Sequence, residues 1–141
     1  MSTRRLATKK RRSFPWRRGW LAAALACLML TGCQGEAIAL PLAGEVEAIQ
    51  GENLAGEPVA LTEAEDIAAV MEVLSTGRST GRESVQDAPL TEPYGSLTLE
   101  NQGGETLLYY YEERGATLVE QPYTGIFRLE GSLEDLLAQL A

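Results

Sequence analysis

Glu105-Thr-Leu-Leu-Tyr-Tyr-Tyr111 is the stretch of this chain that decides its fold. Successive side chains of a strand point to opposite faces, so Tyr109 and Tyr111 fall on one face and Tyr110 falls on the other. Leucines at the two preceding positions extend both apolar faces. A strand that is apolar on both faces is covered on both sides, or binds something with its second face. We therefore predict a central strand here.

Turn signals on either side of this stretch indicate an antiparallel meander. Asn101-Gln-Gly-Gly104 precedes it and Glu112-Glu-Arg-Gly115 follows it, and Gly115 can supply the positive φ that hairpin turns favour. Further strand patterns occupy residues 94–100, 116–121 and 126–130, with weaker ones at 45–49 and 58–61. The sequence thus predicts about four to six strands.

Two amphipathic segments predict helices that pack with this sheet. Within 62–76, apolar residues recur at the spacing of one helical face, at Ile67, Val70, Met71 and Leu74. Thr62 and Glu65 have the spacing of a capping box. A short C-terminal helix at 132–140 begins at Ser132 and carries a leucine face. The predicted fold class is α+β.

The segment from Arg78 to Pro93 is interpreted as one long loop. Unstructured loops of this length in a compact domain are usually functional or mobile. Arg78 and Arg82 lie among serines and threonines and are candidates for a clamp on a small anion or carboxylate. The alternative is that they pair with nearby acids such as Glu83 and Asp87.

The N-terminus reads as an export signal. Eight Lys and Arg residues occur before residue 19, and no acidic residue precedes Glu36. The apolar run Trp20–Leu30 that follows would extend about 16 Å as a helix, which is too short to cross a hydrocarbon core of about 30 Å. Arg11-Arg12-Ser13-Phe14 leaves twin-arginine export open beside the general secretory route.

Leu30-Thr31-Gly32-Cys33 resembles a bacterial lipobox. The resemblance implies cleavage between Gly32 and Cys33 and diacylglycerol on the Cys33 sulfur. We therefore expect three regions: a lipoprotein signal peptide at 1–32, a flexible tether at 33–44 and a single α+β domain at 45–141. The expected location is the extracytoplasmic side of a bacterial cell membrane, with the acyl chains on Cys33 as the anchor.

Charge and composition bound the chemistry. From Cys33 onward the chain keeps 4 arginines and all 20 acidic residues, a formal charge of −16. Such a charge disfavours binding to nucleic acid. The absence of histidine excludes Ser–His–Asp catalysis and Cys/His zinc sites. No calcium loop of the Asp-x-Asp-x-Asp-Gly type occurs. We expect no metal and no cofactor.

Most of the chain after Cys33 resembles a family of small bacterial lipoproteins, found mainly in Gram-positive bacteria, that have no established function. The residues that carry the resemblance are Arg82-Glu-Ser-Val-Gln-Asp-Ala-Pro89, Tyr94, Tyr111-Glu-Glu-Arg-Gly115 and above all the core Glu120-Gln-Pro-Tyr-Thr-Gly-Ile126. The family brings no activity to carry over, so the resemblance implies architecture and location only.

These observations favour a lipid-anchored extracytoplasmic binding module that contacts an envelope protein or a small ligand. The candidate contact residues are two arginines and three tyrosines: Arg78, Arg82, Tyr94, Tyr110 and Tyr123. The alternative is a small carboxylate-dependent hydrolase of the cell envelope. Its acids would be sought first among Glu113, Glu120 and Asp87, because such chemistry needs two carboxylates in one cleft.

Overall fold

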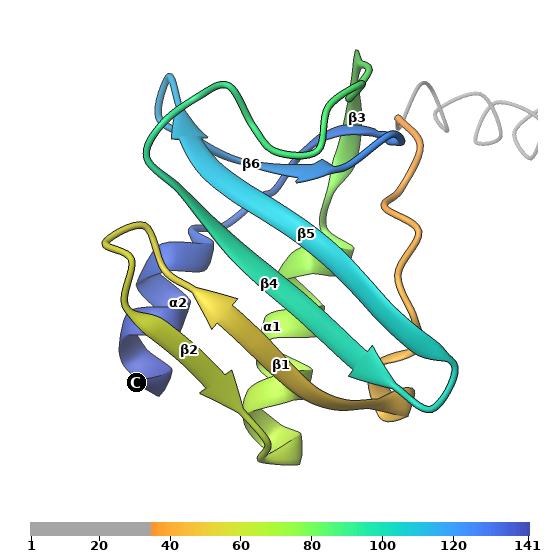
Figure 1. Ribbon diagram of the computed structural model, residues 1–141, viewed down its shortest axis with the longest axis vertical. Coiled ribbons are helices and arrows are strands. Elements are labelled where there is room, and N and C mark those ends of the chain that lie inside the picture. The colour runs from red at the N-terminus through yellow and green to blue at the C-terminus, as the bar shows by residue number, and fades with distance from the viewer. Residues whose placement is uncertain (1–34) are drawn as a thin grey trace, which may run out of the picture. The chain divides into compact units, whose positions relative to one another are not determined.

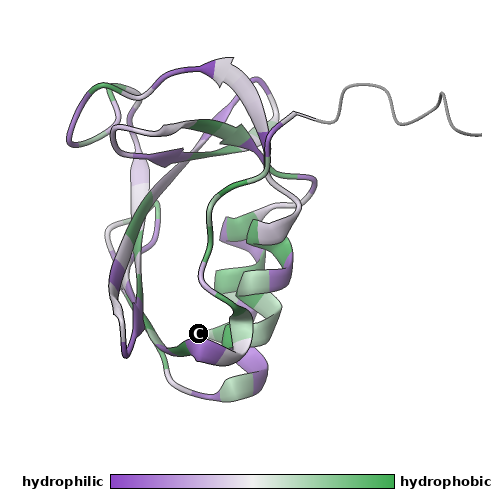
Figure 2. Cartoon of the chain, turned by 90° about the vertical axis from the view of Figure 1, so that its right-hand side faces the viewer, coloured by the Kyte–Doolittle hydropathy of each residue, from purple (hydrophilic) through white to green (hydrophobic). Residues whose placement is uncertain are grey.

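The computed structural model describes residues 35–141 of this chain. The predicted signal peptide, with Gly32 and Cys33, lies outside the described residues. The described part forms one seven-stranded antiparallel sheet with two helices against one of its faces (Figure 1). Figure 2 shows this arrangement from the side, with the sheet on one side and both helices on the other. The α+β fold class predicted from the sequence is confirmed.

The elements follow one another along the chain in a simple order. A 3-10 turn, η2 (Ala43–Glu45), leads into β1 (Val46–Glu52), β2 (Pro58–Leu61), α1 (Ala64–Ser75), β3 (Arg78–Arg82), β4 (Tyr94–Asn101), β5 (Gly104–Glu113), β6 (Ala116–Gln121), β7 (Gly125–Arg128) and α2 (Leu133–Leu140). The spatial order is β2-β1-β4-β5-β6-β7-β3. The predicted meander is thus β4 to β7, flanked by the β1–β2 hairpin at one edge and by β3 at the other.

The seventh strand corrects the sequence analysis. Arg78–Arg82 was predicted to begin a long loop, but it forms edge strand β3 and pairs with β7. All five of its positions are partly or fully exposed, and its residues, Arg-Ser-Thr-Gly-Arg, show no alternation of apolar and polar side chains. Backbone pairing with a strand more than forty residues later makes this segment extended, and local pattern cannot report such pairing. Only residues 83–93 remain without regular structure.

The main core lies between the helices and the inner face of the sheet. The predicted face of α1 is buried as expected, at Ile67, Val70, Met71 and Leu74. It packs into one cluster with sheet and α2 residues that include Ile49, Leu97, Leu99, Leu108, Tyr110, Val119, Phe127, Leu133 and Leu137. Full burial of one such side chain contributes about 1.5–3 kcal/mol before entropy is subtracted. This cluster is therefore the main source of stability.

The two predicted helix caps had different outcomes. Ser132 caps α2 as predicted, because its hydroxyl accepts a hydrogen bond from the Asp135 N–H at 3.2 Å. The predicted capping box at Thr62 is wrong. The N-cap of α1 is Glu63, which makes no side-chain capping bond, and its carbonyl accepts from the Ile67 N–H at 3.0 Å. The first turn of α1 is held by its buried face and backbone bonds instead.

Residues 35–44 pack against the domain, although the sequence analysis places them in a flexible tether. Ile38 is buried in the main core. The Ser79 N–H donates to the Glu36 carbonyl at 2.7 Å, and Ala37 forms a β-bridge with Arg78. Strand β3 would otherwise expose a row of unpaired backbone groups, and this segment covers part of that edge.

Gly95 allows the central strand to bury its tyrosine. In the β4–β5 register Gly95 lies directly opposite Tyr110. A Cβ at this glycine would overlap the Tyr110 ring and lie 2.7 Å from the Glu52 carbonyl oxygen. The absence of a side chain is therefore what admits the aromatic ring into the core.

We predict that Gly95→Ala destabilises the domain by about 1–3 kcal/mol, the usual range for overpacking a core. The matched control is Gly44→Ala, since no heavy atom outside its chain neighbours lies within 4 Å of a Cβ there. Denaturant unfolding of both variants measures the difference. Equal midpoints in the two variants would contradict the role assigned to Gly95.

Candidate functional site

The sheet has a second, smaller apolar cluster on the face away from the helices. Tyr111, Leu118 and Ile126 are buried there, and Tyr94 packs against them. The Tyr94 and Tyr109 rings meet edge to face, with centroids 5.4 Å apart. Strand β5 is thus covered on both faces, which is one of the two arrangements that its sequence left open: Tyr110 lies in the main core and Tyr111 in this outer cluster.

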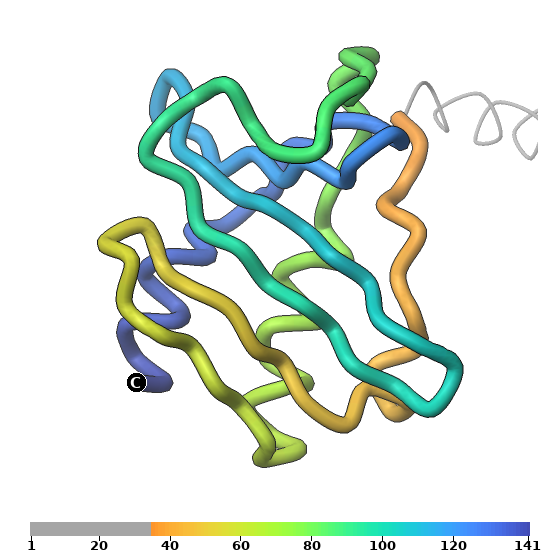
Figure 3. Tube along the Cα trace, viewed as in Figure 1, coloured from red at the N-terminus to blue at the C-terminus, as the bar shows by residue number. Residues whose placement is uncertain are grey.

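The cover over the outer cluster is the segment 83–93, which we call the outer-face loop. Figure 3 traces it at the end of the domain where the β6–β7 turn lies. Three side-chain contacts hold its beginning in place. Arg82, just before the loop, forms an ion pair with Glu113 at 2.8 Å. Ser84 donates to the Glu120 carboxylate at 2.6 Å.

Tyr123 makes the third contact, because its hydroxyl donates to the Asp87 carboxylate. Tyr123 sits in the β6–β7 turn with a positive φ of 58°, and its side chain is 68% exposed. The hydrogen bond to Asp87 raises the pKa of Tyr123, since ionisation would place two negative charges side by side. The three sequence stretches that carry the family resemblance therefore meet in space at this loop.

Buried polar groups mark the underside of the loop. Ser84 and Glu120 are both buried, and their hydrogen bond to each other satisfies the serine hydroxyl. Burial, with the negative charge of Glu120 as a second cause, raises the pKa of the Tyr111 hydroxyl. The side-chain oxygen of Gln121 is buried and has no hydrogen-bond partner among the described residues. The buried Ser84–Glu120 hydrogen bond would be costly to break, so it holds the start of the loop on the sheet.

The predicted arginine clamp is not formed. Arg82 pairs with Glu113 across the outer face. Arg78 instead donates through Nη1 to the carbonyls of Ser75 and Gly77, at 3.0 and 2.8 Å. The two arginines line separate pockets, and Tyr94 lines a third. The candidate residues Arg78, Arg82 and Tyr94 therefore do not converge on one concavity.

Tyr110 is a structural residue, and its prediction as a contact residue is wrong. It is 1% exposed. Its hydroxyl donates to Oε2 of Glu134 in α2 at 2.7 Å. Oε2 of Glu134 also accepts from the Leu54 N–H at 3.2 Å. Glu134 thus ties strand β5 and the β1–β2 hairpin to α2. Periodicity alone could not say which face of β5 the helices would cover.

The three acids considered for hydrolysis all lie on the outer side of the sheet. Glu113 is bound to Arg82, Glu120 to Ser84 and Asp87 to Tyr123. Each therefore holds the outer-face loop or its border in place. Within residues 35–141, no group of three or more Asp, Glu, His or Cys residues is arranged to hold a metal ion.

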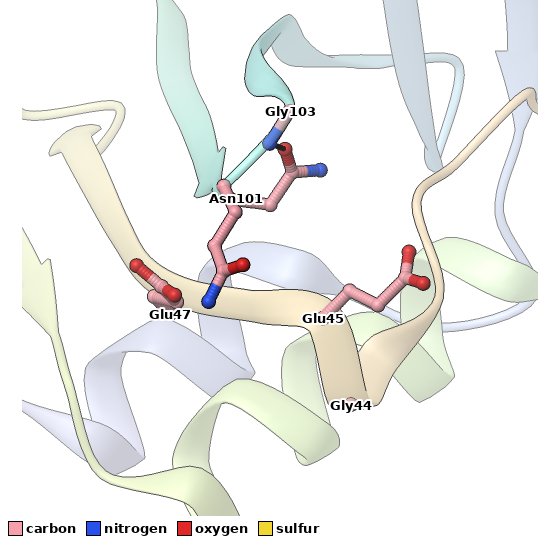
Figure 4. Close-up of a pocket in the computed structure, with 6 residues that line it drawn as sticks. Gly44, Glu45, Glu47, Asn101 and Gly103 are labelled. Atoms are coloured by element: carbon pink, nitrogen blue, oxygen red, sulfur yellow. Dashed lines mark hydrogen bonds between the residues drawn. The ribbon is translucent and has the colours of Figure 1, made fainter.

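An acidic concavity lies at the other end of the sheet. It has a volume of about 440 Å³ and is lined by the β4–β5 turn and by the start of β1, with Glu45, Glu47, Asn101 and Gln102 among its residues. Figure 4 shows the two carboxylates on opposite sides of this concavity. The Asn101 side chain accepts from the Gly103 N–H at 2.8 Å and so shapes the turn.

Fold and site together define a small α+β domain whose seven-stranded sheet carries helices on one face and, on the other, a loop held by side-chain contacts. Residues 34–128 match a protein family described as a domain of unknown function (DUF5300), and the chain belongs to this family. It is also similar to an NMR structure of a protein from Ruminococcus gnavus. The two chains are 35% identical, with a TM-score of 0.63, over 72% of this chain and 99% of that one. A comparison with curated proteins gave no match.

Within the described residues, neither helix has the length and apolar character needed to cross a membrane.

Alkaline pH tests the Tyr110–Glu134 contact. Burial, followed by the hydrogen bond to Glu134 and the negative charge of that carboxylate, raises the pKa of Tyr110 far above its ordinary value of 10.0. Above pH 10 the unfolded chain therefore loses the Tyr110 proton while the folded protein keeps it. The stability contributed by the protonated hydroxyl is present below pH 10 and is lost as the pH rises above 10. We predict that the free energy of unfolding falls less steeply above this pH in Tyr110→Phe than in the unchanged protein. Chemical denaturation at a series of pH values measures the slopes, and equal slopes would contradict this account.

Proposed function

We propose that this protein is a lipid-anchored extracytoplasmic interaction module of a bacterial cell membrane that contacts an envelope protein through its outer-face loop. The single observation that carries the proposal is the state of that loop. It is fastened to the sheet by side-chain contacts, yet it presents Val85 and Leu90 to solvent, 72% and 83% exposed.

Ordered, exposed apolar side chains favour recognition. A loop that served only to cover the outer cluster would turn its large apolar residues inward, because exposing them forgoes burial energy. Instead the loop buries Ser84 and Pro89, and its two large aliphatic side chains, Val85 and Leu90, are exposed. Tyr123 adds an exposed aromatic ring beside Asp87. Aromatic and aliphatic groups fixed on a rigid scaffold are typical of protein contact sites.

The anchor is proposed from the lipobox at residues 30–33. Cys33 lies two residues before Gly35, a reach of about 7 Å of extended chain. Gly35 in turn lies against Ser79 of β3, since a Cβ at this glycine would be 2.7 Å from the Ser79 carbonyl oxygen. Acyl chains on Cys33 would therefore hold the β3 edge close to the lipid surface and leave little free tether.

The anchor is tested by metabolic labelling with palmitate in a bacterium that processes lipoproteins. We expect label in the full chain and in Cys27→Ala, but none in Cys33→Ala. The mature product should begin at Cys33, and mass spectrometry of its N-terminal peptide can establish this. An unlabelled chain, or a product that keeps its arginine-rich leader, would refute the anchor.

The contact surface is tested by cross-linking in intact cells. We expect the double variant Val85→Asp/Leu90→Asp to lose a cross-linked envelope protein that the unchanged protein retains. Leu42→Asp is the matched control, because Leu42 is also exposed, at 69%, but lies before β1 and away from the loop. All three positions are exposed, so the fold is expected to survive. Equal recovery of the cross-linked protein by the double variant would overturn this assignment.

A further inference from the structure

Two arginines face each other across the edge of the sheet. The β3–β7 register places Arg78 directly opposite Arg128. Like charges in this position destabilise a strand pair. From Cys33 onward the chain holds 4 arginines and 20 acidic residues. The pairing of Arg78 with Arg128 is unusual there, because it places half of the positive charges together.

Neither guanidinium is neutralised by a carboxylate within the described part of the chain, where the ion pair found is Arg82 with Glu113. The two bonds from Arg78 to the carbonyls of Ser75 and Gly77 use one nitrogen, Nη1. They fix the guanidinium beside the C-terminus of α1 and leave its Nε and Nη2 donors available. The Arg128 side chain is exposed and makes no hydrogen bond within residues 35–141.

Both arginines line one pocket of about 630 Å³ at this edge, in the size range of small-molecule sites. Two of the three hydroxyls that line the pocket already donate to the protein: Thr76 to the Val73 carbonyl and Thr80 to the Ile126 carbonyl, at 2.6 and 2.8 Å. The side-chain donors left for a ligand are therefore the two guanidinium groups and the Ser79 hydroxyl, which accepts from the Gly81 N–H at 3.1 Å. Glu130 also lines the pocket and brings its formal charge to +1.

We propose that the Arg78–Arg128 pocket binds a phosphate group carried by a small molecule. One guanidinium fork saturates a single carboxylate, whereas two forks match a tetrahedral oxyanion with three or four acceptor oxygens. Glu130 offers an acceptor for a hydroxyl elsewhere on the same molecule. This inference goes beyond the proposed function, because the pocket lies at the β3–β7 edge and contains no residue of the outer-face loop.

The overall charge favours a small ligand over a polyanion. At physiological ionic strength the Debye length is about 8 Å, so distant acids are screened from a group held in contact with both arginines. A long polyanion, by contrast, would extend over the acidic surface of a segment whose formal charge is −16. The same phosphate chemistry occurs in free phosphate and in lipid headgroups, and the experiment below separates these sources.

The test uses residues 33–141. Gln34–Ala141 form a compact unit, and the NMR structure of the related protein covers a domain of matching extent, so this part folds on its own. Inorganic phosphate is titrated at constant ionic strength while the arginine Nε–H resonances are followed by NMR. We expect saturable shifts at Arg78 and Arg128. In Arg128→Gln we expect the affinity for phosphate to fall about tenfold or more, in line with the loss of a charge-assisted hydrogen bond.

Arg114→Gln is the matched control, because it removes the same charge from the exposed β5–β6 turn. Arg128→Lys keeps the charge but loses the fork, and we expect intermediate binding. Equal binding by all variants, no saturable shift with phosphate, or acetate binding as tightly as phosphate would overturn the proposal.

A second arm separates the ligand sources. Residues 33–141 are coupled through Cys33, the sole cysteine of this segment, to vesicles of phosphatidylcholine with or without phosphatidylglycerol. Arginine shifts that need phosphatidylglycerol identify a headgroup phosphate, and shifts with soluble phosphate alone identify a free one. Chemical coupling replaces acylation, so failure of the anchor proposal leaves this result unaffected, and absent phosphate binding leaves the palmitate test unaffected.

Discussion

The constraint on which the rest of the structure depends is that β5 must be covered on both faces. Tyr110 and Tyr111 are adjacent, both are buried, and they point to opposite sides of the sheet. A sheet with a single helical layer can cover only one of them. The helices cover Tyr110, with Glu134 of α2 accepting the bond from its hydroxyl. The second side needs a separate cover, and the outer-face loop supplies it.

The two covers are held on the sheet by different kinds of interaction. The helical side is a large continuous core, so its free energy comes from burial of apolar area. The loop side buries three residues and is positioned by polar contacts such as Ser84 with Glu120. Polar contacts specify geometry more than they add stability. A loop held in this way keeps its large aliphatic side chains, Val85 and Leu90, exposed to solvent.

Most local patterns in the sequence predicted the structure correctly. The helical face of α1, the Ser132 cap and the β4–β7 meander follow from spacings within a few residues, and all of these are found. The capping box at Thr62 is the local pattern that is not formed. The other predictions failed where a distant partner decides the conformation. β3 is extended because β7 lies beside it, and Ile38 is buried because it packs into the main core. Neither segment carries a periodicity that could report those neighbours.

The residues of the candidate site could be identified from the sequence, but their partners could not. By itself the sequence determined which residue types were available: four arginines in an acidic segment, three consecutive tyrosines and the core Glu120–Ile126. Only the tertiary structure decided their partners, because antiparallel registers join positions that are far apart in the chain. It joined Arg82 to Glu113, buried Tyr110, and set Arg78 opposite Arg128 instead of beside Arg82. Side-chain chemistry is written in the sequence, whereas the distance between two side chains is fixed by strand pairing.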